Sequence, residues 1–371
     1  QTDELRAHQD DPWYVRKILA EQYFSRDLFD YRLPLRSDTY FFGREDIVQH
    51  YLDAIKRSEN RALFGLRKTG KTSVLFKLHR LVNQDDLGDV FFFDCKRPSI
   101  RKQRWFELLG NVASTIAQHY KLPLNSVFNE FNGDEAFIRL IEATPKERRL
   151  VLVFDEIDWI SPAAIKDPHW HQDFIEFWQT IWSCQSEHRR LSAIIAGVNP
   201  SIIETDLIDG VQNPLFGIVP FNYLRGLSRE GISTLLDTLG KRMGLKFDYT
   251  AVDYIFQQYG GHPYLTRLAA TQINRLTEPS KRPFEISNNF LTSTEEEREI
   301  DLAFYCQHVI SELKEFYPDE YFLMQLLASR QIPDFYELAI PEYRKHLVDY
   351  GLLSYDKNQV PYIAIPAVGR Y

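Results

Sequence analysis

The sequence predicts an α/β fold built on a parallel sheet, and two patterns carry this prediction. Four short runs are apolar at most of their positions, namely 61–65, 90–93, 150–154 and 191–196. The segments between them repeat their apolar residues at helical spacing instead. Strands that are apolar throughout and alternate with helices are typical of a parallel sheet that helices cover on both faces.

Each helix of this α/β region is predicted from one apolar stripe. The stripes comprise Val74, Leu75, Leu78, Leu81 and Val82 after the first run, Trp105, Leu108, Leu109, Val112 and Ile116 after the second, and Trp170, Phe174, Phe177, Trp178, Ile181 and Trp182 after the third. Before the first run, a weakly amphipathic helix is expected over about 10–29, with Pro34 ending the helical pattern.

The second half of the chain loses its strand signals beyond Pro220 and becomes helical as far as about Leu276. Ser228 has the side chain and position of an N-cap for the first of these helices. The paired glycines and proline in 260–263 are expected to interrupt the series.

The C-terminal part is expected to begin after a linker over 278–297, which holds two prolines and a polar series. A helix-rich tail follows and ends in two apolar runs, 352–355 and 360–365, on either side of a turn. Helices followed by a two-stranded wing predict a winged-helix domain.

Length and composition limit the function classes. The 371 residues are enough for two or three domains, and 44% hydrophobic residues exclude a disordered chain. The net charge of −8 argues against a general nucleic-acid coat protein, and no apolar run approaches the roughly 20 residues that span a bilayer. Three widely spaced cysteines form neither a disulfide framework nor a metal cluster, which favours a reducing, cytoplasmic location without membrane contact.

The strongest motif is a phosphate-binding loop between the first strand and its helix. Residues 65–72 read Gly-Leu-Arg-Lys-Thr-Gly-Lys-Thr, a full match to G-x-x-x-x-G-K-[ST]. Backbone N–H groups of such a loop point at phosphate oxygens, Lys71 reaches the β- and γ-phosphates, and the Thr72 hydroxyl binds Mg²⁺. The alternative is a chance glycine-rich turn. The residues predicted to bind nucleotide here are Gly65, Lys68, Thr69, Gly70, Lys71, Thr72 and Ser73.

Acidic and amide side chains follow the third and fourth strands. Asp155 is predicted to hold Mg²⁺ through water, and Glu156 to act as the general base toward the attacking water. Asp158 is assigned a structural or surface role. Asn199 has an amide suited to lie between the γ-phosphate and that water. Solvated acids at a strand end and a plain Asn-Pro turn are the alternatives.

Together these motifs resemble the AAA+ superfamily, specifically the signal-transduction ATPases with numerous domains (STAND) and their prokaryotic AAA-like relatives. The resemblance includes a Gly-Arg box in 40–45, Gly-x-Pro at 261–263 and a winged-helix tail. It implies binding of ATP or ADP with Mg²⁺, an adenine pocket that includes Phe42, Gly43 and Arg44, and a contact of Pro263 with the nucleotide. The domains implied are an N-terminal helical segment (1–37), a P-loop ATPase core (38–222), a helical lid (223–280) and a winged helix (295–371).

Two departures from that pattern concern arginine. Residues 212–217 contain none where ring-forming relatives place an arginine finger, and Pro263 or Tyr264 stands at the arginine position of the lid. Arg267 lies one helical turn later; it is expected to be a solvated surface residue, and the alternative is that it substitutes for the lid arginine. An arginine at the transition state contributes about 10³–10⁵ in rate, so slow hydrolysis is expected.

The resemblance therefore favours a STAND-type switch that couples ADP and ATP states to conformational change and self-oligomerisation, with effector or sensor partners. Its known outputs include transcription, cell-death signalling and defence against phage. The alternative is a DNA-handling AAA+ ATPase of the initiator or transposition-regulator type that grips duplex DNA with its winged helix. The basic cluster in 96–104 is the best nucleic-acid candidate, although a solvated helix start is the favoured interpretation. His169 and His171 lack further residues at metal-ligand spacing.

Overall fold

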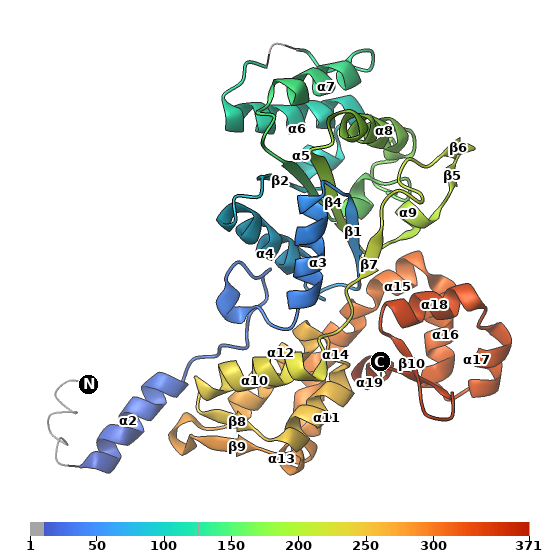
Figure 1. Cartoon of the computed structure of the whole chain (residues 1–371). Coiled ribbons are helices and arrows are strands. Elements are labelled where there is room, and N and C mark those ends of the chain that lie inside the picture. The colour runs from blue at the N-terminus through green and yellow to red at the C-terminus, as the bar shows by residue number, and fades with distance from the viewer. Residues whose placement is uncertain (1–10, 125, 371) are drawn as a thin grey trace.

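The core of the protein is a five-stranded parallel sheet with the strand order β2–β3–β4–β1–β7. A computed structural model describes the protein over residues 11–124 and 126–370 (Figure 1). The strands are β1 (Arg61–Phe64), β2 (Asp89–Asp94), β3 (Leu150–Asp155), β4 (Leu191–Gly197) and β7 (Phe221–Tyr223). The four predicted strands are confirmed. The fifth, β7, was missed because it has only three residues, all half-buried, and a polar one at its centre.

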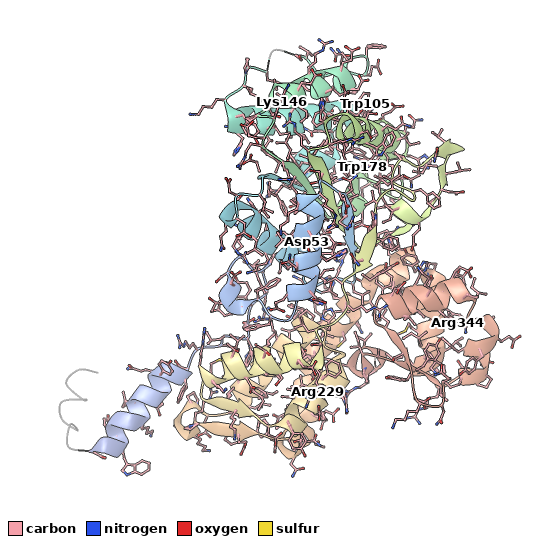
Figure 2. All side chains as sticks on the ribbon, in the orientation of Figure 1. Asp53, Trp105, Lys146, Trp178, Arg229 and Arg344 are labelled. Carbon is pink, nitrogen blue, oxygen red and sulfur yellow. The ribbon has the colours of Figure 1, made fainter. Side chains whose placement is uncertain are left out.

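Helices cover both faces of the sheet (Figure 1), as the apolar runs predict. On β3 the residues alternate between two cores: Leu152 and Phe154 pack on one side, Val151 and Val153 on the other. The first core includes α6 (Trp105–Tyr120), α7 (Gly133–Ala143) and α8 (Trp170–His188), and the second includes α3 (Glu45–Lys56) and α4 (Lys71–Gln84). Figure 2 labels Trp105 and Trp178, two buried side chains of the first core.

The strand order brings the predicted functional segments to one edge of the sheet. Because the strands are parallel, the loop after β1, the acids after β3 and Asn199 after β4 all emerge at their carboxyl ends. β4 pairs with both β1 and β3, so its end lies between the phosphate-binding loop and the acidic segment. This edge is where ligands bind in open parallel sheets.

The lid follows β7 and consists of α10 (Arg229–Lys241), β8 (Leu245–Phe247), α11 (Tyr249–Tyr259) and α12 (Pro263–Leu276). The predicted cap is confirmed, because the Ser228 hydroxyl accepts a hydrogen bond from the Gly231 N–H at 3.1 Å. The interruption at 260–263 is also confirmed, because Gly260 and Gly261 both adopt positive φ between α11 and α12.

The predicted linker is wrong. Its residues form η3 (Pro279–Lys281), β9 (Phe284–Ile286), α13 (Asn288–Ser293) and the start of α14 (Glu295–Val309). β9 pairs in parallel with β8, and Ile286 and Leu291 are fully buried in the lid core. The four apolar residues of this polar, proline-containing stretch, Phe284, Ile286, Phe290 and Leu291, give no periodic signal. Their burial depends on a partner strand about forty positions earlier in the chain.

The C-terminal unit, residues 295–370, starts with α14 and α15 (Ser311–Phe316). It continues through α16 (Pro318–Ala328), α17 (Ile332–Leu338) and α18 (Pro341–Asp349) to the hairpin β10 (Leu353–Tyr355)–β11 (Pro361–Ile363) and α19 (Pro366–Gly369). Three helices followed by an antiparallel hairpin give the winged-helix arrangement expected from the sequence. One apolar core runs through both the lid and the C-terminal unit, so these two parts pack as one body.

Shorter elements complete the described chain. α2 (Pro12–Phe24) begins at an Asp11 cap and ends earlier than the predicted helix, and residues 1–10 of the predicted N-terminal segment lie outside the described residues. The others are η1 (Asp38–Tyr40), α5 (Pro98–Arg101), η2 (Ile157–Ile160), α9 (Ser201–Glu204) and the hairpin β5 (Leu207–Ile208)–β6 (Val211–Gln212). In the part of the chain that the structure covers, no helix has both the length and the apolarity that crossing a membrane requires.

Candidate active site

The phosphate-binding loop joins β1 to α4, as its sequence predicts. Gly70 has φ +103°, a conformation that glycine adopts readily and other residues rarely do. At Gly65 a Cβ atom would lie 2.8 Å from the Leu224 carbonyl oxygen, so only glycine fits there as well. The Thr69 hydroxyl donates to the Leu66 carbonyl at 2.9 Å and thereby closes the loop. The N-terminus of α4, which is 14 residues long, opens from this loop.

A cavity of 370 Å³ lies against the loop, and its lining is strongly cationic. Glu156 is the one carboxylate among the lining residues. The cationic lining residues are Arg32, Arg67, Lys68, Lys71, Lys96 and Arg267. Six cations around one carboxylate, beside a helix N-terminus, create a strongly positive potential. Such a site suits a polyanion such as a nucleoside triphosphate.

Lys71 lies within the loop. Its Nζ donates to the carbonyls of Gly65 at 2.7 Å and Leu66 at 3.1 Å. Burial lowers the pKa of Lys71, while the nearby Glu156 carboxylate opposes this shift. The ammonium group is therefore held inside the loop at the point where phosphates would bind.

Thr72 and Asp155 lie together, as the predicted Mg²⁺ site requires. The Thr72 hydroxyl donates to Asp155 Oδ2 at 2.7 Å, and Asp155 is 4% exposed. Burial raises the pKa of Asp155 to about 6, and the hydrogen bond from Thr72 opposes that shift. A hydroxyl beside a buried carboxylate is a set of hard oxygen ligands, and a divalent cation would offset the burial of the negative charge. These residues fit Mg²⁺.

The two acids after Asp155 point in different directions. Glu156 adopts a left-handed conformation with φ +55° and lines the cavity, as a general base must. Asp158 turns to the end of β4 instead, where its carboxylate accepts from the N–H groups of Val198 at 2.9 Å and Asn199 at 2.8 Å. Of the two roles expected for Asp158, the structural one is correct.

Asn199 is buried and does not line the cavity. Its Oδ1 accepts a hydrogen bond from the Ser201 N–H at 3.0 Å, which closes the Asn-Pro turn before α9. The same oxygen accepts from the hydroxyl of Tyr317, a residue of the C-terminal unit, at 2.8 Å. The bond to Ser201 agrees with the interpretation of Asn199 as part of an Asn-Pro turn. Its catalytic role stays a prediction.

Residues 31–35 form one wall of the cavity, and the sequence analysis missed them. The Leu35 N–H donates to the Ser73 hydroxyl at 2.9 Å, and Lys68 Nζ donates to the Arg32 carbonyl at 3.3 Å. The Tyr31 ring stacks on Tyr40 with 5.2 Å between ring centroids. The sequence of this segment offers only Pro34 as a signal, and a proline after a helical pattern indicates only an end to that pattern.

The predicted adenine-pocket residues lie beside the loop but not in the cavity lining. Phe42 packs on the lid core, and Gly43 closely approaches Gly231 of α10. The Arg44 side chain donates to backbone carbonyls, including those of Thr69 at 3.3 Å and Arg225 at 2.6 Å. These three residues therefore connect the phosphate-binding loop to the lid, and an adenine contact stays a prediction.

The lid contributes Pro263, Tyr264 and Arg267 to the cavity. The expectation of an exposed Arg267 is wrong: the residue is 5% exposed, and its Nη2 donates to the Tyr40 carbonyl at 2.7 Å. Among the described residues no group accepts from its Nη1. Its position on the inner face of α12 buries it, and burial lowers the pKa of Arg267 to about 10. A buried guanidinium in a cavity wall, with a hydrogen-bond acceptor for Nη2 and none for Nη1 among the described residues, is suited to bind an anionic ligand.

His262 connects the lid to the loop. The Leu265 N–H donates to its Nδ1 at 3.4 Å, so Nε2 carries the proton and donates to the Arg67 carbonyl at 3.0 Å. Burial lowers the pKa of His262 to about 4, which keeps the ring neutral. Pro263, the next residue, is the first residue of α12 and also lines the cavity. Its position is compatible both with a role in interrupting the helices and with the predicted nucleotide contact.

The basic cluster in 96–104 is largely paired with acids. Arg104 binds Asp173 through two nitrogens at 2.7 and 2.9 Å, Arg97 pairs with Asp94 at 3.3 Å, and Arg101 pairs with Asp167. The structure does not bring the two histidines to one metal. His169 contacts the Gln103 carbonyl at 2.9 Å, and His171 contacts Asp209 at 2.8 Å.

The fold can be compared with known proteins at this point. No family model matches the chain, and no curated protein matches it. The Walker-type ATPase PABY2304 of Pyrococcus abyssi superimposes with a TM-score of 0.61 at 15% identity, over 92% of this chain and 98% of that one. The Aeropyrum pernix ORC2 protein, solved as ADPNP–ADP complexes, superimposes with a TM-score of 0.52 at 11% identity, over 90% and 95% of the two chains. The chain thus has a parallel-sheet P-loop ATPase fold with a helical C-terminal region.

Proposed function

We propose that this protein binds ATP with Mg²⁺ in the cationic cavity, hydrolyses it, and transmits the nucleotide state to its C-terminal unit. One observation carries the proposal. The cavity brings together the phosphate-binding loop, the Thr72–Asp155 pair and Glu156, and its wall is otherwise cationic. The likeness to a Walker-type ATPase and to an ADPNP- and ADP-bound protein supports the choice of nucleotide.

The residues have separate roles in this scheme. The loop N–H groups, Lys71 and Arg267 bind the phosphates, and Thr72 with Asp155 holds Mg²⁺, which when bound offsets phosphate charge. The half-buried Glu156 accepts a proton from the attacking water. With no arginine in 212–217, an arginine finger is missing from its usual place, and we expect hydrolysis to be slow.

The C-terminal unit is docked against the end of β4, which supports a nucleotide-dependent switch. The Tyr350 hydroxyl donates to the Val198 carbonyl at 2.6 Å, and Arg225 binds the Asp349 carboxylate at 2.8 Å. These contacts use α18 and the residue after it. In the STAND-type form of the proposal, a trigger acting together with the exchange of ADP for ATP releases these contacts and promotes self-oligomerisation.

A second candidate function is action on duplex DNA, the alternative to a signalling switch. One surface of the chain suits it. The Trp159 ring lies 5.8 Å from Lys96 Nζ, 5.3 Å from Arg101 Cζ and 5.2 Å from Lys166 Nζ. Aromatic rings among cations are typical of nucleic-acid contacts.

The winged helix is the less suitable contact for DNA. Residues 295–371 contain 14 Asp and Glu against 7 Lys and Arg, a net charge of −7 that repels phosphates. Its third helix, α18, also faces the ATPase core in this structure. We therefore place any DNA contact at the surface around Trp159.

Hydrolysis is tested by phosphate release with the wild type, Lys71→Ala and Glu156→Gln. We expect slow, Mg²⁺-dependent release that both variants abolish, and retained ATP binding in Glu156→Gln. Equal rates for wild type and Glu156→Gln would contradict the assignment of the general base. A wild type that binds neither ATP nor ADP would contradict the proposed function.

The DNA function is tested by duplex binding at low and high salt, with Trp159→Ala and the distant surface variant Lys246→Ala as its control. Binding that weakens with salt and is lost in Trp159→Ala alone would support this function. No binding at low salt would exclude it. The mass in solution with ADP and with a non-hydrolysable ATP analogue tests self-oligomerisation in the same preparation.

A further inference from the structure

The end of β4 is held from two sides by groups that belong to different parts of the protein. On the catalytic side, the Asp158 carboxylate binds the N–H groups of Val198 and Asn199. On the other side, Tyr350 binds the Val198 carbonyl and Tyr317 binds the Asn199 side chain. Tyr317 and Tyr350 both come from the C-terminal unit. Any displacement of that unit therefore acts directly on Asn199.

The orientation of the Asn199 amide follows from its partners. The backbone N–H of Ser201 is a donor, so the side-chain atom 3.0 Å from it is the oxygen Oδ1. The Tyr317 hydroxyl then donates to the same oxygen at 2.8 Å. Across residues 11–124 and 126–370, no group accepts a hydrogen bond from Nδ2. The two bonds use both lone-pair directions of Asn199 Oδ1, and the two N–H groups of Nδ2 are therefore available to a ligand.

Tyr317 is itself firmly held. Its ring packs against His346 and Tyr350 with centroid separations of 5.0 and 6.0 Å, at the start of α16. Burial raises the pKa of the Tyr317 hydroxyl, so the group stays protonated and remains a hydrogen-bond donor at neutral pH. The Asn199 amide is thus fixed by one donor from its own loop and one from the docked C-terminal unit.

We propose that Tyr317 is a positioning residue for ATP hydrolysis, which holds the Asn199 amide with its N–H groups available to the γ-phosphate whenever the C-terminal unit is docked. This inference rests on the proposed ATPase function and adds to it a route from domain docking to the rate of the chemical step. Undocking removes the Tyr317 hydroxyl and leaves the amide to rotate about its terminal bond. Docked and undocked forms should then differ in kcat.

The test is a double-mutant cycle on single-turnover hydrolysis with Tyr317→Phe, Asn199→Ala and the double variant. Tyr336→Phe is the matched control, because it also removes one hydroxyl from the C-terminal unit, and this hydroxyl donates to the Gln359 carbonyl at 2.9 Å instead of to Asn199. A hydrogen bond of ordinary net strength predicts a rate loss of roughly five- to tenfold in Tyr317→Phe, with an unchanged Kd for ADP. The double variant should be no slower than Asn199→Ala, and Tyr336→Phe should keep the wild-type rate.

Three outcomes would overturn the inference: an unchanged rate in Tyr317→Phe, a raised Kd with an unchanged rate, or losses in Tyr317→Phe and Asn199→Ala that simply multiply. A second measurement does not depend on turnover. The ratio of affinities for a non-hydrolysable ATP analogue and for ADP should fall in Tyr317→Phe and stay at its wild-type value in Tyr336→Phe. If the wild type binds nucleotide without hydrolysing it, the proposed hydrolysis fails, while an unaltered affinity ratio in Tyr317→Phe would separately reject the role of Tyr317.

Discussion

His346 joins the C-terminal unit to the ATPase core, and its replacement by glutamine gives a quantitative test of docking. The ring lies between two carboxylates: Nδ1 is 2.6 Å from Glu320 in its own unit, and Nε2 is 3.4 Å from Glu204 of α9 in the core. The hydrogen bonds to Glu204 and Glu320 raise the pKa of His346 from 6.5 to about 9. Lys345, 3.8 Å from Glu204, is the nearby cation that competes for this carboxylate.

The size and pH range of the effect follow from that pKa. Because the folded-state value is raised, the stabilisation is fully present below about pH 6.5 and is lost as the pH rises through about 9. At about 1.36 kcal/mol per pKa unit, the change sets an upper limit of about 3 kcal/mol. Glutamine keeps a hydrogen-bond donor but carries no charge. It also leaves the buried Glu320 without its cation, so the additional change Glu320→Gln should restore part of the stability.

The assay is hydrogen exchange of the amides in 198–204 and in α18, from pH 6 to pH 9.5, after correction for the intrinsic pH dependence of exchange. We expect the wild type to lose protection steeply above pH 8 and His346→Gln to show low protection with little pH dependence. Parallel curves for wild type and variant would refute the reasoning. So would a loss of protection that begins on the acid side of pH 6.5, because protonated His346 is the stabilising form.

Further predictions concern the cavity. Arg267→Met should weaken ATP binding by about ten- to a hundredfold, because a hydrogen bond to a charged group contributes that much. Calorimetric titration measures the Kd, and an unchanged Kd would exclude a contact between Arg267 and the phosphates. Asp155→Asn should abolish Mg²⁺-dependent hydrolysis, measured as phosphate release across a Mg²⁺ titration. In the wild type the Mg²⁺ requirement should increase as the pH falls through about 6, where Asp155 gains a proton, and a flat Mg²⁺ titration between pH 5 and pH 7.5 would contradict this. Gly65→Ala should lower the free energy of unfolding by about 1–3 kcal/mol, because its methyl group would collide with the Leu224 carbonyl. Denaturant unfolding of both proteins, with the same dependence of the free energy on denaturant concentration, measures the loss.

Prediction from sequence was most successful for features that local patterns encode. The phosphate-binding loop depends on glycine conformation and on a strand and helix beside it, so eight consecutive residues specify it. The four longer strands were predicted because burial on both faces makes most of their positions apolar, as in β3 and β4. Helices such as α6 and α8 were predicted because one buried face repeats apolar residues at helical spacing.

Features that depend on distant partners were missed or assigned wrongly. Arg267 is buried where α12 meets the Tyr40 carbonyl, 227 positions earlier in the chain, so the sequence placed it in solvent. β9 is too short to show a period and gains its order from β8. Residues 31–35 line the cavity because the chain crosses the phosphate-binding loop there, and no sequence pattern in this segment predicts that position.

The sequence by itself determined the α/β class, the phosphate-binding loop, and the acids and amide that follow β3 and β4. Each of these is a property of one short segment, because hydrophobic periodicity and glycine conformation act over a few residues. Only the tertiary structure decided which groups share the cavity, which acid faces it, and which C-terminal residue holds Asn199. Those outcomes depend on packing between segments more than a hundred residues apart, such as Asn199 and Tyr317, and such contacts have no local signature.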